Sequence, residues 1–118
     1  HSGALFTNYK YMNNGLDSVF KDVGRELISA EASDLGKFKV PSLRNIMLTA
    51  PYMHDGRFKS IDDVLNHYQH GVKYSSTLAS ELSGTKQLGI PLTNEEIDDL
   101  KLFLETLTDY EFISKPIF

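Results

Sequence analysis

Apolar and polar residues recur with a helical period in two parts of the chain. Near its C-terminal end, Thr93 and Glu96 form the pattern of a capping box, and the residues that follow place an apolar side chain at every third or fourth position. Earlier, Ser60 and the acidic residues after it predict a helix that runs to about His70 and stops at Gly71. We expect the apolar face of the last helix to lie in the core: Ile97, Leu100, Phe103, Leu104 and Leu107.

The N-terminal part shows little periodicity. Residues 1–27 are rich in Gly, Asn and Tyr and are interpreted as loops, with a turn at Asn13-Asn14-Gly15 and a short strand around Tyr9–Met12. Residues 28–36 predict one or two helical turns that stop at Gly36.

The middle of the chain is marked by prolines. Pro41 suits the first position of a short helix over Ser42–Leu48, and the residue before Pro51 is pushed out of the helical conformation, which ends that segment. Residues 71–92 hold small and polar residues and predict a surface loop. Residues 1–118 are therefore expected to form one domain, mostly helical, with long loops.

Composition removes several classes of function. The chain has 118 residues, a net charge of −4 and a pI near 5.5, without the basic stripe that nucleic-acid binding requires. No apolar run approaches the roughly 18 residues of a membrane-spanning helix. There are no cysteines, which excludes disulfides and Cys-type zinc sites within these residues.

The richest candidate chemistry lies in residues 51–58. This loop holds Met53, His54, Asp55 and Arg57, and Met and His side chains both ligate haem iron. The alternative is structural: Met53 fills a gap in the core, while His54 caps a helix or pairs with Asp55.

A second cluster lies on the helix predicted after Ser60. His67 and His70 have a spacing that could hold a metal, but a third ligand is not evident, and two surface histidines are the alternative. Tyr68 shares a face with the apolar residues Val64 and Leu65 and should point inward. A buried Tyr either finds a hydrogen-bond partner or, as phenolate, ligates ferric haem, and its spacing leaves both open.

Residues 36–58 contain FKVPSLRN and LTAPYMHDG, and PLTNEE follows later in the chain. These motifs resemble the C-terminal domain of bacterial di-haem cytochrome c peroxidases and MauG-type enzymes, and the resemblance extends over essentially the whole chain. It implies an all-α, cytochrome c-like fold. The opening residues, HSGALFT, resemble those that follow the second CxxCH motif of the family. His1 would then be the His of that motif and the proximal ligand of haem c, with the attachment cysteines upstream.

The resemblance also implies further ligands. Tyr68 stands where family members carry the distal Met, or the Tyr of MauG-type enzymes, with Met53 as the alternative distal ligand. The backbone carbonyls of Thr49 and Pro51 match positions that help bind Ca²⁺. Three further residues are candidates for haem-propionate or interface contacts, or for ordinary ion pairs: Arg44, His54 and Arg57. No residue is assigned a catalytic role.

The implied function is reduction of hydrogen peroxide to water, with this domain relaying or storing one oxidising equivalent. The N-terminal haem domain of the same protein is the expected neighbour, a small c-type cytochrome or copper protein the electron donor, and the periplasm the location. The chain alone is expected to be inactive. The alternatives are a MauG-type oxidase acting on a protein substrate, and a haem-less helical binding module. Self-association into a homodimer also stays open.

Overall fold

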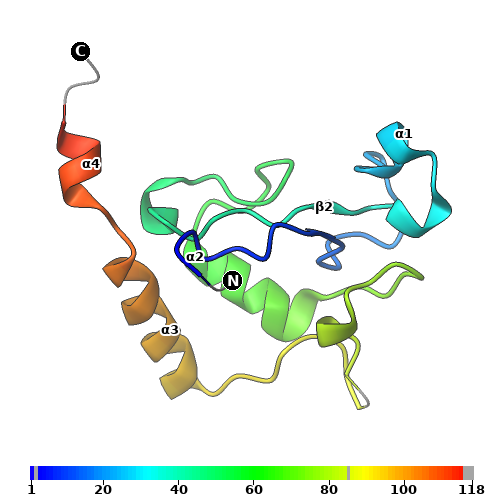
Figure 1. Ribbon diagram of the computed structural model, residues 1–118. Coiled ribbons are helices and arrows are strands. Elements are labelled where there is room, and N and C mark those ends of the chain that lie inside the picture. The colour runs from blue at the N-terminus through cyan, green and yellow to red at the C-terminus, as the bar shows by residue number, and fades with distance from the viewer. Residues whose placement is uncertain (2, 85, 116–118) are drawn as a thin grey trace.

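The chain folds into short helices around a small sheet, with long connecting segments (Figure 1). The computed structural model describes residues 1, 3–84 and 86–115. Its regular elements are α1 (Glu26–Ser29), α2 (Ile61–Asn66), α3 (Asn94–Thr106), α4 (Tyr110–Ser114), β1 (Tyr11–Met12) and β2 (Phe38–Lys39). None of the described helices has the length and apolar character needed to cross a membrane.

The sheet corrects the expectation of an all-α fold. β1 and β2 pair antiparallel, with Tyr11 opposite Lys39. The two segments stay together beyond the sheet, at Val40, which directly follows β2. Val40 N–H donates to the Lys10 carbonyl (2.9 Å), and the Thr7 hydroxyl donates to the Val40 carbonyl (2.7 Å). Two extended segments that lie side by side satisfy their backbone groups in this way. The short strand expected near Tyr9–Met12 is confirmed, whereas its partner was not anticipated.

The two principal helices begin as their sequences predict. The Ser60 hydroxyl accepts from Asp63 N–H, and Thr93 and Glu96 form both hydrogen bonds of a capping box. α2 continues into a π-helical turn over His67–Gly71, so the helical stretch ends at the expected glycine. Such wider turns are rare and occur often at functional sites.

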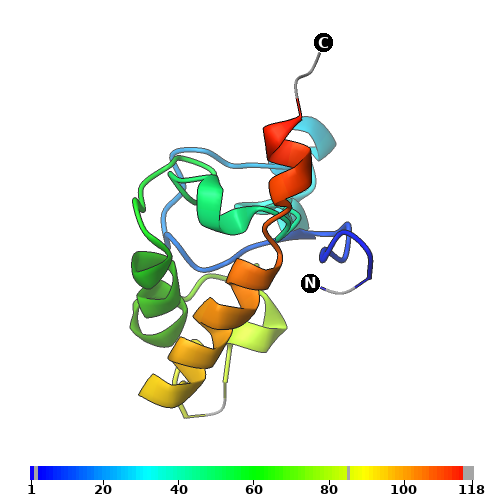
Figure 2. The same cartoon turned by 90° about the vertical axis from the view of Figure 1, so that its left-hand side faces the viewer.

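The core forms where α2 and α3 lie side by side (Figures 1 and 2). Leu104 and Leu107 of the expected apolar face are buried, but Leu100 and Phe103 are 36% and 46% exposed and line an open groove with Pro91. The expectation that the whole face is core is therefore wrong for these two residues, because the described part of the chain packs against one side of α3. The buried cluster consists of Tyr52, Ile61, Leu65, Leu104 and Leu107.

The short helix expected over Ser42–Leu48 is largely absent. A 3-10 helix covers Ile46–Leu48 alone, because Asn45 adopts a left-handed conformation (φ 59°). Asn45 is held there by two contacts with the end of α3: its N–H donates to the Leu107 carbonyl (3.0 Å), and its side-chain oxygen accepts from Asp109 N–H (2.6 Å). These tertiary contacts override the local preference set by the proline.

The remaining expectations hold in outline. The helical turns expected over 28–36 appear as α1 and a 3-10 helix at Ala32–Asp34, interrupted by Ala30 at φ 58°, and the stretch stops at Gly36. Residues 71–92 form a long connection, as expected, although it contains a 3-10 helix at Ser80–Leu82.

Candidate functional site

His1 is held in a fixed orientation by the turn that follows it. Its Nδ1 atom donates to the carbonyl of Phe6 at 2.7 Å, and Phe6 N–H donates to the Gly3 carbonyl at 3.1 Å. The other ring nitrogen, Nε2, is then the one able to bind a metal. Histidine ligands in proteins commonly have this arrangement, in which one ring nitrogen donates to a backbone carbonyl.

Arg44 fixes the same turn. Its Nε donates to the Ala4 carbonyl at 2.7 Å, and its guanidinium lies over the Phe6 ring, 5.7 Å from the centroid. In the structure Arg44 therefore holds the segment that carries His1.

Tyr68 lies within the π-helical turn and is partly buried. Burial raises the pKa of Tyr68, while a side-chain hydrogen bond with Asn14 acts in the opposite direction. The phenol is therefore neutral near pH 7, and a bound cation would be needed to make it a phenolate. Its backbone is also held, because the Tyr68 carbonyl accepts from Ile90 N–H at 2.8 Å.

Of the two interpretations of His67, the one that places it on the surface is wrong. Its side chain is buried, and Nε2 donates to the Asn14 carbonyl at 2.8 Å. Burial lowers the pKa of His67. His70 is exposed, so the two histidines do not form a pair, and the described residues contain no group of three His, Cys, Asp or Glu side chains able to hold a metal.

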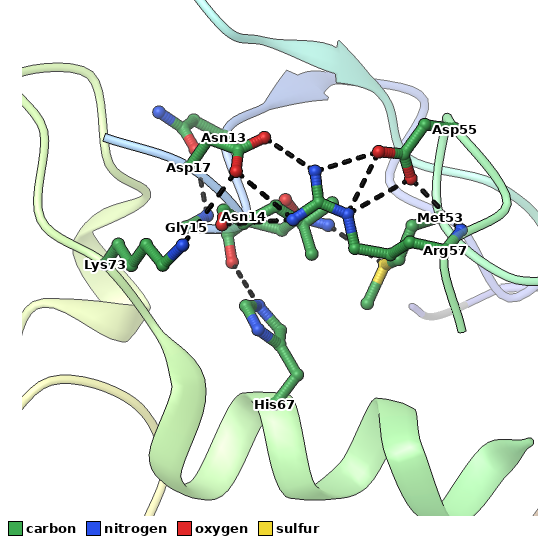
Figure 3. A network of polar contacts seen from close by, with 10 residues as sticks. Asn13, Asn14, Gly15, Asp17, Met53, Asp55, Arg57, His67 and Lys73 are labelled. Carbon is green, nitrogen blue, oxygen red and sulfur yellow. Dashed lines mark hydrogen bonds and ion pairs between the residues drawn. The ribbon is translucent and has the colours of Figure 1, made fainter. Parts of the chain in front are cut away.

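Met53 and His54 face different neighbours. Met53 adopts φ 73°, and its sulfur accepts from the Asn14 amide at 3.3 Å (Figure 3). His54 stacks on Phe38 of β2, with ring centroids 3.8 Å apart. The structure therefore places Met53 against Asn14, a residue that sequence analysis treated only as part of a turn.

Arg57 joins two loops through a pair of carboxylates (Figure 3). Its Nη2 atom lies 2.7 Å from Asp17 and 2.8 Å from Asp55. The guanidinium lowers the pKa of both carboxyl groups, and they in turn raise the pKa of Arg57. This is the ion-pair role that the sequence left open for Arg57.

We expect the Arg57→Leu variant to lose about 1 kcal/mol of unfolding free energy at pH 7, since partly exposed ion pairs contribute little each. Folded Asp17 and Asp55 have a pKa below the ordinary value of 3.8, so their stabilisation is present above pH 3.8 and is lost as pH falls through the folded values. Denaturant unfolding at pH 7 and pH 3 checks this. The matched control is Arg25→Leu, whose ion pair involves the single carboxylate of Asp34. A pH-independent loss for Arg57→Leu would contradict the assignment.

The expected calcium positions lie beside this loop. Thr49 and Pro51 are both exposed, and the Ala50–Pro51 peptide is cis. The Thr49 hydroxyl donates to the Ile46 carbonyl at 3.2 Å.

The chain was compared with known proteins. Models of known protein families gave no match. The chain is 36% identical over 107 residues to cytochrome-c peroxidase IdrP2 of Denitromonas iodatirespirans, covering 86% of the chain and 29% of the relative. It is 34% identical over 109 residues to the methylamine utilization protein MauG of Methylorubrum extorquens (91% and 29%) and 31% identical over 114 residues to cytochrome c peroxidase Ccp of Escherichia coli (91% and 21%).

A solved structure of a MauG-like protein is also similar to this chain. The crystal structure of a MauG-like protein associated with microbial copper homeostasis superposes with a TM-score of 0.70 at 38% identity, over 90% of this chain and 36% of that one. The chain spans less than a third of the length of the curated relatives named above.

Proposed function

Because the chain belongs to the cytochrome c peroxidase and MauG family, we propose that it forms the C-terminal haem domain of a di-haem enzyme that reduces hydrogen peroxide to water. This domain relays or stores one oxidising equivalent, and the N-terminal haem domain of the same protein binds the peroxide. The observation that carries the proposal is the partly buried Tyr68 on a π-helical turn of the helical stretch that begins with α2.

The donor atoms suit a haem better than a metal held by side chains alone. The described residues offer no cluster of three ligating side chains, whereas haem iron takes just two axial ligands from the protein. His1 and Tyr68 supply that pair, since His1 presents Nε2 and Tyr68 a phenol oxygen.

When bound, the haem supplies one-electron iron chemistry. The Phe6 carbonyl holds the His1 ring in one orientation, and Arg44 holds the turn that provides this carbonyl. Tyr68 would hold the group as a phenolate, because a bound cation offsets the burial that otherwise raises the pKa of Tyr68. A phenolate is a hard anionic donor that favours ferric iron, so it would give a haem bound here a low potential.

The same proposal assigns roles to the remaining candidate residues and partners. Met53 packs beside the ligand rather than binding iron, and His54 and Arg57 border the haem domain or its interface. The carbonyls of Thr49 and Pro51 contribute to a Ca²⁺ site that other ligands complete. A small c-type cytochrome or copper protein in the periplasm donates the electrons, and the domain can associate as a homodimer.

A MauG-type oxidase acting on a protein substrate is the second candidate. Tyr68 and the similarity to MauG favour it. A very low potential of this haem, together with oxidation of a protein side chain in place of steady peroxide reduction, would distinguish it from the peroxidase.

A pyridine haemochrome spectrum tests the cofactor itself. The domain, extended upstream through its own natural sequence and expressed with haem-maturation machinery, is expected to give a c-type spectrum with one haem for each chain. The control is the same protein with His1 replaced by Ala, whose absorption spectrum before pyridine is added should lose the features of His ligation. No covalent haem in the extended protein would make His1 incidental and favour a haem-less binding module.

A further inference from the structure

Two side chains of one segment, Ser42 and Arg44, bind consecutive carbonyls of the turn that follows His1. The Ser42 hydroxyl donates to the Leu5 carbonyl at 2.6 Å, and Arg44 Nε donates to the Ala4 carbonyl at 2.7 Å. The two residues also contact each other, because the backbone N–H of Arg44 donates to the Ser42 hydroxyl oxygen at 3.1 Å. The turn is therefore held at two adjacent peptide groups by a pair of linked residues.

Phe6, the next residue of the turn, has a backbone conformation that needs such support. It adopts φ 48°, in the left-handed region that a bulky side chain rarely enters and keeps only where its surroundings hold it there. Its ring meets that of Phe103 edge-on, with centroids 6.1 Å apart, and the buried Thr7 that follows donates its hydroxyl to the Val40 carbonyl at 2.7 Å. In this conformation the Phe6 carbonyl accepts from Nδ1 of His1 at 2.7 Å.

We propose that Ser42 and Arg44 are positioning residues for His1. By holding the turn, they keep the Phe6 carbonyl in contact with Nδ1 of His1 and so set how strongly Nε2 donates to iron. The inference rests on the proposed role of His1 as ligand. A histidine whose second ring nitrogen donates to a carbonyl is fixed in one tautomer and one orientation, and it is a more basic ligand. A more basic ligand favours ferric iron, so the two residues lower the potential of the haem proposed for this domain.

The test is a redox titration of the full-length holoenzyme carrying Ser42→Ala, which removes one hydroxyl and no charge. The ferric-to-ferrous ratio of this haem at a fixed potential is expected to fall about threefold, below the roughly 10–100-fold effect of groups that bind a ligand directly. At about 59 mV for each tenfold change in a one-electron couple, this is a rise of about 28 mV. Ser83→Ala is the matched control, because the Ser83 hydroxyl also donates to a backbone carbonyl, that of Ser80, at 3.0 Å. Ser42→Thr, which keeps the hydroxyl, should restore the wild-type potential.

Arg44→Lys is an independent variant and covers the case in which Ser42→Ala fails to fold. It keeps the positive charge and loses the planar guanidinium, so the rise in potential expected for it does not come from a loss of charge. Its control is Arg25→Lys, since the Arg25 guanidinium also lies over an aromatic ring, that of Tyr11, 4.2 Å from the centroid. With both changes present, the rise should be smaller than the sum of the two separate rises, because either change already releases the same turn.

An unchanged or lower potential in Ser42→Ala, compared with Ser83→Ala, would overturn the inference, as would a loss of stability in denaturant unfolding without any shift in potential. His1→Ala separates this failure from failure of the proposed function. If the potential and the absorption spectrum of the haem do not change in His1→Ala, then His1 is not a ligand, and both the proposed role and the inference are wrong. If they change, while the Ser42 and Arg44 variants equal their controls, the inference alone is wrong.

Discussion

The Tyr68→Met variant of the full-length protein is expected to raise the reduction potential of the haem proposed for this domain, by on the order of 0.2 V out of the roughly 0.8 V range that axial ligands set. The reason is the exchange of donors. A neutral thioether favours ferrous iron, whereas a phenolate favours ferric iron. Spectroelectrochemical titration of the purified holoenzyme measures the shift.

The control for this prediction is Tyr74→Met, because Tyr74 is 67% exposed and lies outside the candidate site. Its potential should equal that of the wild type. An unchanged potential in Tyr68→Met would remove Tyr68 from the ligands and leave Met53 as the candidate. A rise in both variants would point to a nonspecific effect of the substitutions.

The Gly89→Ala variant is expected to lose about 2–5 kcal/mol of unfolding free energy. Gly89 adopts φ +88°, where a side chain costs about 1–2 kcal/mol. An added methyl group would also collide with the Tyr68 carbonyl, and overpacking of this kind costs about 1–3 kcal/mol. Because the neighbouring Ile90 N–H binds the same carbonyl, the collision displaces the turn that carries the candidate ligand. Denaturant unfolding measures the loss.

Gly3→Ala separates the two causes of that loss. Gly3 adopts φ +73°, and among the described residues no atom lies within 4 Å of an added methyl group. This control should show the backbone cost alone. Equal losses at the two glycines would mean that the contact with Tyr68 contributes nothing.

Local patterns predicted some of this structure. The starts of α2 and α3 depend on Ser60 with Asp63 and on Thr93 with Glu96, pairs only three positions apart. Contacts of this range form wherever the helix forms, so the sequence alone is enough to place them. The family motifs likewise indicated the family, which the relatives confirm.

The candidate site was predictable only in part. The residues proposed as ligands come from motifs, and their roles stay predictions. The motifs did not contain the environment of these residues: the burial of His67, the stacking of His54 on Phe38, and the hydrogen bond from Asn14 to Met53. The nearest signal, the Asn13-Asn14-Gly15 turn, indicates a change of chain direction and carries no information on which side chain the turn will face.

The sequence by itself determined the family, the two capped helices and the list of residues with ligand chemistry. The tertiary structure decided which of these residues meet. His67 and Asn14 are 53 positions apart, Arg57 and Asp17 are 40, and Asn45 is 64 from Asp109. Contacts over such separations depend on the packing of the whole chain, which local periodicity and capping patterns do not encode.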